Sequence, residues 1–211
     1  MEKWDWNAIS HIAPNLYLSA VTAINDQSLA DLGITLIINA TKELPMFPPK
    51  NPTIQSVRVP VYDNTDANLA PYFQVSLWNC IILNIHNINW ISIFQPICKL
   101  IKANEDQQGS TLIHCMAGRS RSATLTIAYL LWKEGGSITT KYRLYDVLNT
   151  VQEKRPIVQP NAAFIKQLVH WEDELKSGQM KERHLDEAET SAINEIKQIT
   201  QRIKQECWLS H

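Results

Sequence analysis

The chain has 211 residues, of which 45% are hydrophobic and 19% charged, and its formal net charge is −1. This length suits one domain with a tail, and the hydrophobic content is sufficient for a buried core. The balanced charge gives no electrostatic case for a nucleic acid or an anionic membrane as partner, and the start of the chain lacks the apolar run of a secretion signal.

The predicted elements alternate between strands and helices along the chain. In chain order they are a strand at 15–19, a helix at 22–32 that ends at Gly33, strands at 34–39, 54–61 and 110–114, and helices at 121–133, 144–154 and 162–175. Such alternation predicts an α/β fold with a central, mostly parallel sheet flanked by helices. Ligands of such sheets bind beyond the carboxyl ends of the strands.

One stretch interrupts this pattern. Val75–Gln95 is rich in Ile and Asn and contains no Lys, Arg, Asp or Glu. If its 21 residues are removed, Gln74 meets Pro96. Four apolar residues then share one face of a helix, namely Phe73, Ile97, Leu100 and Ile101.

Three interpretations of Val75–Gln95 compete. Its length would allow a membrane-spanning helix, but its four Asn and one His argue against that interpretation. It is otherwise a genuine insertion whose exposed apolar residues bind a partner, or a retained intron. We favour the retained intron, because 21 codons keep the reading frame, Val-Ser can be encoded from GT, and Phe-Gln can end in CAG.

A short segment between a strand and a helix carries the strongest chemical signal. Residues 114–122 read His-Cys-Met-Ala-Gly-Arg-Ser-Arg-Ser. Consecutive backbone amides in a tight loop, together with a helix N-terminus, form a positive concavity of the size of an anion. The same field lowers the pKa of a thiol and makes it nucleophilic. The segment therefore predicts a phosphate pocket with Cys115 as nucleophile.

The other residues of this segment have distinct expected roles. Gly118 allows the loop to turn through a positive φ, and the guanidinium of Arg121 suits two phosphate oxygens. Ser122 is expected to donate a hydrogen bond from its hydroxyl to the thiolate as the S–P bond breaks. His114 is expected to brace the loop by hydrogen bonds. The phosphate-binding loop consists of Met116, Ala117, Gly118, Arg119, Ser120 and Arg121. A cysteine protease is a weaker interpretation, because it requires neither Gly118 nor Arg121.

These motifs resemble the dual-specificity branch of the cysteine-dependent protein tyrosine phosphatase superfamily. His114–Ser122 is similar to its signature, Ala128–Leu131 to its Ala-Tyr-Leu-Met motif, and Arg155–Asn161 with Phe164 to its Arg-Pro-x-Ile-x-Pro-Asn-x-x-Phe stretch. The resemblance covers about residues 9–175, with one interruption. It implies a catalytic domain at 9–176 with the protein-tyrosine-phosphatase-like fold of an atypical, stand-alone member. It also implies a supporting role for Asn161.

The general acid is expected in the segment after the strand at 54–61. Proton delivery to the leaving oxygen requires a positioned acid, and the candidates are Asp63 and Asp66. By resemblance Asp63 holds the acid position. It precedes Cys115 by 52 residues, and subtraction of the 21-residue interruption leaves 31, close to the separation in the family.

The resemblance implies hydrolysis of phosphotyrosine and phosphoserine or phosphothreonine in proteins through a phospho-cysteine intermediate. No metal or cofactor is expected, because Arg121 and the loop amides supply the positive charge. Two alternatives remain open. One is a phospho-binding scaffold without turnover, and the other is a phosphatase of a phosphoinositide, an RNA 5′-phosphate or a glycan.

The four cysteines and the C-terminal segment complete these expectations. Cysteines 80, 98, 115 and 207 have neither zinc-site spacing nor the density of a disulfide framework, which favours the reducing cytoplasm or nucleus.

Residues 177–211 form a separate tail in which Ile193, Ile196 and Ile203 recur at helical spacing. This predicts an amphipathic helix that packs on its own domain or contacts a partner.

Overall fold

The computed structural model describes residues 5, 7–61, 63, 81–82, 90–133 and 143–177. Its strands form one six-stranded sheet in the order β1-β2-β6-β3-β4-β5. These are β1 (Ser10–Ala13), β2 (Leu16–Ala20), β3 (Ile34–Asn39), β4 (Gln55–Arg58), β5 (Ile81–Ile82) and β6 (Ser110–Cys115). Only β1 and β2 pair antiparallel. The predicted α/β class with a mostly parallel sheet is confirmed.

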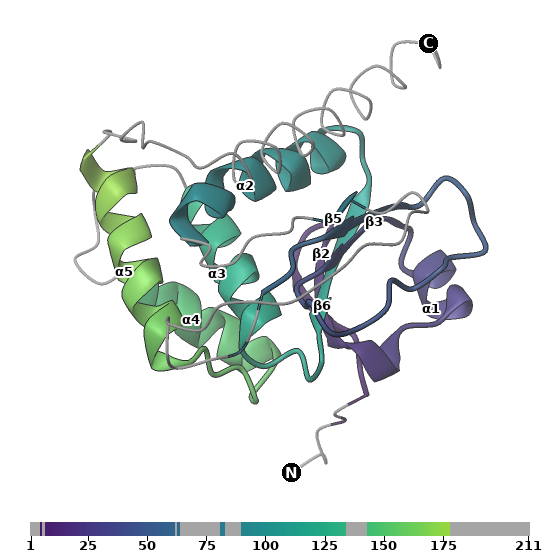
Figure 1. Cartoon of the computed structure of the whole chain (residues 1–211), viewed down its shortest axis with the longest axis horizontal. Coiled ribbons are helices and arrows are strands. Elements are labelled where there is room, and N and C mark those ends of the chain that lie inside the picture. Colours follow the sequence, from purple (N-terminus) through teal and green to yellow (C-terminus); the bar gives the residue numbers. More distant parts are fainter. Residues whose placement is uncertain are drawn as a thin grey trace.

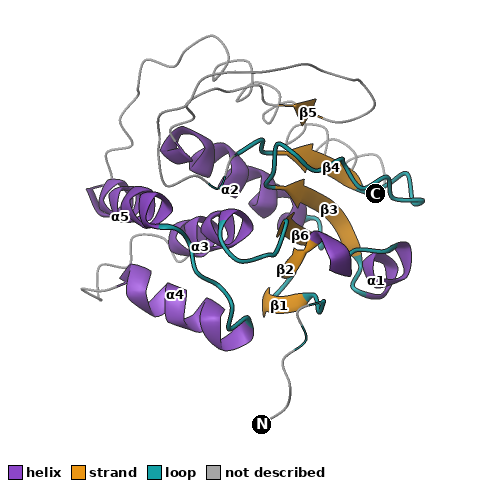
Figure 2. Cartoon of the chain, turned by 60° about the horizontal axis from the view of Figure 1, so that its bottom comes forward, coloured by secondary structure: helices purple, strands orange, loops and turns teal. Residues whose placement is uncertain are grey.

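Helices cover both faces of the sheet (Figure 1). They are α1 (Asp26–Asp31), α2 (Trp90–Asp106), α3 (Arg121–Lys133), α4 (Arg143–Lys154) and α5 (Ala162–Ser177). Figure 2 shows α2 to α5 grouped together and α1 on the other side of the sheet. No helix in the described ranges is long and apolar enough to cross a membrane.

Strand β6 lies between β2 and β3 and pairs in parallel with both. Ile113 and Cys115 belong to the apolar cluster under α2 to α5, whereas Leu112 belongs to the smaller cluster on the side of α1. Because the strand is covered on both faces, all six of its residues, Ser-Thr-Leu-Ile-His-Cys, are buried instead of alternating between buried and exposed. The pairing with β2 and β3 places Cys115 at the carboxyl end of a central strand.

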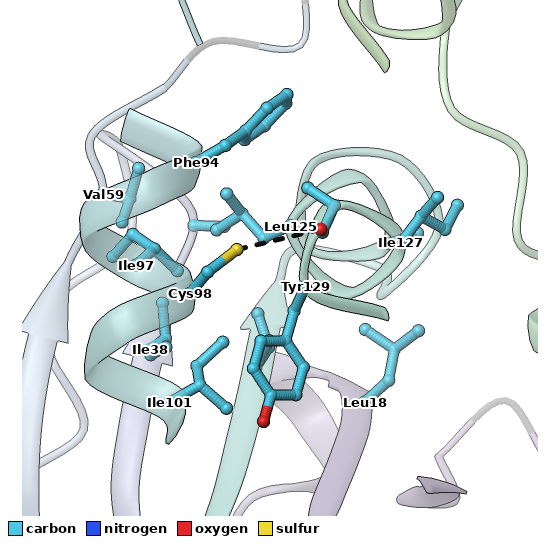
Figure 3. Close-up of a cluster of buried hydrophobic side chains, with 14 of the residues drawn as sticks. Leu18, Ile38, Val59, Phe94, Ile97, Cys98, Ile101, Leu125, Ile127 and Tyr129 are labelled. Carbon is cyan, nitrogen blue, oxygen red and sulfur yellow. Dashed lines mark hydrogen bonds between the residues drawn. The ribbon is translucent and has the colours of Figure 1, made fainter. Parts of the chain in front are cut away.

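Helix α3 is the central helix that the sequence predicts, with the same bounds, 121–133. Most of its residues are buried because it packs against the sheet, α2, α4 and α5. The carbonyl oxygen of Ala128 accepts hydrogen bonds from Trp171 Nε1 at 3.1 Å and from Cys98 Sγ at 3.8 Å. Figure 3 shows Cys98 facing α3 from α2. These bonds join three helices behind the pocket.

The segment expected to form one helix at 22–32 is divided in two. A short 3-10 helix covers Val21–Ala23, and α1 begins only after Asn25. Asn25 and Ser28 form a reciprocal capping box, which satisfies the first free amides of α1 and starts a new helix there. The predicted end at Gly33 is confirmed, since Gly33 has a φ of 60°.

Helix α2 begins inside the interruption, at Trp90. Phe94 is fully buried and lies edge-on to Trp171, with ring centroids 5.6 Å apart. Ile97, Leu100 and Ile101 are buried as predicted, while the expected partner residue Phe73 lies outside the described residues. Phe94, which lies within Val75–Gln95, therefore contributes to the core in this structure.

Candidate active site

The phosphate-binding loop, residues 116–121, runs from the end of β6 into the first residue of α3. Gly118 has a φ of 64°, as predicted for the turn of this loop. A Cβ atom at this position would lie 2.5 Å from the backbone carbonyl of Ser19. Glycine is therefore required both by the backbone conformation and by the approach of β2. Ser120 is buried, whereas Met116 and Arg119 are exposed at the rim.

The Cys115 thiol lies at the base of this loop and is 2% exposed. Its sulfur accepts hydrogen bonds from Ser122 Oγ at 3.1 Å and from the Gly118 amide at 3.3 Å. Burial alone would raise the pKa of the thiol, but the Ser122 hydroxyl, the backbone amides of Ser122 and Arg119, and the charge of Arg121 together lower it. This arrangement favours the thiolate, the nucleophilic form.

Arg121 is buried beside the loop. Its Nη1 donates to Glu43 Oε1 at 2.5 Å and to the Val61 carbonyl oxygen at 3.2 Å. Its Nε is buried and has no hydrogen-bond partner among the described residues. Buried donors without partners are rare in folded proteins, and a phosphate oxygen would satisfy this one.

Asp63, the residue assigned as general acid by resemblance, lies close to Arg121. Its Oδ1 accepts hydrogen bonds from Ser120 Oγ at 2.8 Å and from Asn161 Nδ2 at 3.0 Å. Its Oδ2 is 3.8 Å from Arg121 Nε, which is too far for a hydrogen bond but within the range of an ion pair. Asp66, the alternative acid, lies outside the described residues.

His114 is fully buried, but it does not show the hydrogen bonds expected of a brace. Neither ring nitrogen has a hydrogen-bond partner in the described part of the chain. Burial, with a smaller contribution from the charge of Arg58, lowers the pKa of His114 to about 4. The ring is therefore neutral at pH 7, and it is buried within the central strand β6.

Two residues that the sequence analysis did not single out contact the site. One is Glu43, which pairs with Arg121 and precedes it by 78 residues. The other is Arg155, which is fully buried and donates from Nε and Nη2 to the carbonyl oxygens of Gly118 and Ala117 at 2.8 and 3.0 Å. Arg155 is the first residue of the Arg-Pro stretch, and that motif could have identified it from the sequence. No sequence motif marked Glu43.

Replacing Arg155 by methionine should lower the free energy of unfolding by about 3 kcal/mol or more, because hydrogen bonds from a charged donor contribute about 1.5–3 kcal/mol each. Besides the two loop carbonyls, the guanidinium bonds the Ala8 carbonyl oxygen at 3.0 Å and Ser10 Oγ at 3.2 Å. Urea denaturation measures the change. Lys154→Met, at the exposed neighbouring position, is the control and should change stability by about 0.5 kcal/mol or less. Equal effects of the two variants would show that Arg155 does not support the loop.

Replacing Ser122 by alanine should shift the acidic side of the pH–rate profile to higher pH. The hydroxyl stabilises the thiolate, so its loss raises the pKa of Cys115, and more alkaline solution is then needed to form the nucleophile. The rate below neutral pH should fall about 10- to 100-fold, since a hydrogen bond to a charged group contributes about 1.5–3 kcal/mol. Thr126→Val removes a buried hydroxyl one turn away and should leave the profile in place. An unshifted profile for Ser122→Ala would contradict this role.

Comparison with known proteins agrees with this geometry. The family model of the dual specificity phosphatase catalytic domain matches residues 16–174. Dual specificity protein phosphatase 9 of Homo sapiens is 34% identical over 177 residues, which cover 83% of this chain and 38% of that protein. Dual specificity protein phosphatase 14 of Homo sapiens is 33% identical over 172 residues, covering 81% of this chain and 72% of that protein.

A solved structure shares the fold. The crystal structure of a mouse putative dual specificity phosphatase complexed with zinc tungstate has a TM-score of 0.62 and 28% identity, and the match covers 81% of this chain and 89% of that one. The chain therefore belongs to the dual specificity phosphatase family, and it is a protein phosphatase of that family.

Proposed function

We propose that this phosphatase acts on phosphotyrosine and phosphoserine or phosphothreonine with Cys115 as nucleophile and Asp63 as general acid. The observation that carries these roles is the convergence at one loop of three groups. They are the hydrogen-bonded Cys115 sulfur, the Arg121 Nε that lacks a hydrogen-bond partner among the described residues, and the carboxylate of Asp63. The mouse relative's crystal contains zinc tungstate, and tungstate is a tetrahedral oxyanion like phosphate.

The first step transfers the phosphoryl group to the enzyme. The Cys115 thiolate attacks phosphorus, an S–P bond forms, and the P–O bond of the ester breaks. Asp63 gives its proton to the leaving oxygen as charge develops there. Arg121 and the loop amides bind the oxygens of the transferred group throughout.

The second step releases inorganic phosphate. A water molecule attacks phosphorus and gives a proton to Asp63, which now acts as base. The S–P bond breaks and its electron pair returns to Cys115. The Ser122 hydroxyl, 3.1 Å from the sulfur, stabilises the departing thiolate. Covalent catalysis of this kind divides one difficult displacement into two easier ones.

Phosphate release from matched substrates tests the substrate class. Phosphotyrosine and phosphothreonine peptides should be hydrolysed, while a phosphoinositide headgroup and an RNA 5′-phosphate should be poor substrates. Preference for either non-protein phosphate would reassign the substrate. Binding of phosphopeptides without any release of phosphate would favour a scaffold.

Val75–Gln95 affects the proposed mechanism because it lies between the proposed acid and the nucleophile in the sequence. We propose that a shorter product without it exists and folds. Phe73-Gln74 and Phe94-Gln95 repeat the same dipeptide, so removal of the stretch places Phe73 two residues before Pro96, where Phe94 now contacts Trp171. Pro96 would also move from the interior of α2 towards its first turn, where proline is tolerated.

Transcript sequencing across this junction, with assays of both forms, tests the proposal. A mature transcript that retains the 21 codons throughout contradicts the retained intron. A shorter protein that fails to fold contradicts the replacement of Phe94 by Phe73.

The proposed cellular setting follows from the nucleophile. Cys115 has to remain a thiolate, and a reducing cytoplasm or nucleus maintains it. The predicted C-terminal helix, with its proposed contact to a partner, lies outside the described residues.

A further inference from the structure

Asn161 directly precedes α5 and caps it. Its Oδ1 accepts a hydrogen bond from the backbone amide of Phe164 at 2.9 Å, and its carbonyl oxygen accepts the first bond of the helix from Ile165 at 3.0 Å. The cap fixes the plane of the side-chain amide, because one end of that amide is bonded to the helix.

The other end of the same amide contacts Asp63. With Oδ1 facing α5, Nδ2 donates to Asp63 Oδ1 at 3.0 Å. Ser120, in the phosphate-binding loop, donates to the same oxygen at 2.8 Å and also accepts from the Asn161 backbone amide at 3.4 Å. The carboxylate is thus bonded to two elements that lie 57 and 98 residues away from it in sequence.

We propose that Asn161 is a positioning residue for the reaction, which orients the carboxyl group of Asp63 through its capped side-chain amide. This inference rests on the proposed role of Asp63 as general acid. The bond keeps Asp63 next to Arg121, the group that binds the phosphoryl oxygens, so the proton lies near the leaving oxygen before the reaction begins. Such preorganisation lowers the barrier without new contacts to the substrate.

Asn161→Ser separates the two functions of the side chain. Serine caps a helix about as well as asparagine, but its shorter hydroxyl serves the cap and does not reach Asp63. The phenolate of phenyl phosphate is a poor leaving group. We expect kcat for this substrate to fall about 10-fold with little change in KM, because the lost hydrogen bond acts in the transition state. For p-nitrophenyl phosphate the loss should be about 2-fold or less, since that leaving group needs little proton donation.

A matched variant controls for the loss of an asparagine cap. Asn25 caps α1 by accepting a hydrogen bond from the Ser28 amide at 2.9 Å, and α1 lies on the opposite side of the sheet from α5 (Figure 2). Asn25→Ser should leave the ratio of the two kcat values unchanged. If it lowers that ratio as much as Asn161→Ser, the effect comes from helix capping and the proposal is overturned.

A double-mutant cycle identifies the residue through which Asn161 acts. In an Asp63→Ala background, Asn161→Ser should cause no further loss on phenyl phosphate. A further 10-fold loss of kcat in that background would overturn the inference about Asn161 but not the role of Asp63. An equal loss of kcat on both esters when Asn161→Ser is made in the unmutated protein would do the same. If Asp63→Ala itself shows no dependence on the leaving group, the acid assignment fails, and this inference fails with it.

Discussion

Cys115→Ser is expected to abolish phosphate release from every substrate, with a loss of at least about 10⁴-fold, as for removal of a nucleophile from a catalytic unit. A serine hydroxyl in the same place is a far weaker nucleophile, because neither the loop amides nor Arg121 brings its pKa near neutrality. The loss should appear in kcat, and binding of a phosphotyrosine peptide, measured by calorimetry, should survive.

Cys98→Ser is the matched control for this change. Cys98 is the other buried cysteine of the described residues, and its thiol contacts the Ala128 carbonyl oxygen in the core rather than the pocket. This variant should retain turnover at a temperature where it is folded. Phosphate release that persists in purified Cys115→Ser protein would falsify the cysteine mechanism.

Asp63→Ala should lower kcat by about 10²- to 10⁴-fold on substrates with poor leaving groups, the usual contribution of general acid–base catalysis. The reason is that phenolate and alkoxide ions leave slowly without a proton. Activated aryl phosphates should lose much less. A series of substituted phenyl phosphates measures this dependence on the pKa of the leaving group.

Asp66→Ala is the companion variant, because Asp66 is the alternative acid. It should leave the leaving-group dependence of the parent protein intact. If Asp63→Ala loses activity equally on all phenyl phosphates while Asp66→Ala acquires the steep dependence, the acid is Asp66.

The assignments of Cys115 and of Asp63 differ in how much of each could be predicted from the sequence. The Cys115 pocket depends on a strand, a tight loop and a helix that are adjacent in the chain. The turn at Gly118, the start of β6 and the bounds of α3 were predicted for that reason. The prediction of one helix at 22–32 was wrong. It relied on apolar spacing and overlooked the capping box of Asn25 and Ser28, which starts α1.

The contacts that orient the site were not accessible in the same way. Asp63 was chosen by resemblance, but its bonds to Ser120 and Asn161 join segments 57 and 98 residues apart. The pairing of Glu43 with Arg121 and the four bonds of Arg155 also depend on distant segments. No local pattern specifies which side chain fills a buried position beside such a loop.

The sequence by itself therefore determined the chemistry, a thiolate and an arginine around one phosphate-sized loop, because that geometry follows from neighbouring residues and from one glycine with a positive φ. Only the tertiary structure decided what holds Asp63 and Arg121 in place. The parallel pairing of β3 with β4 and β6 brings the segments that carry Glu43 and Asp63 to that loop, and the packing of α5 on α3 brings Asn161 there. Long-range packing of this kind leaves no periodic signal in the chain.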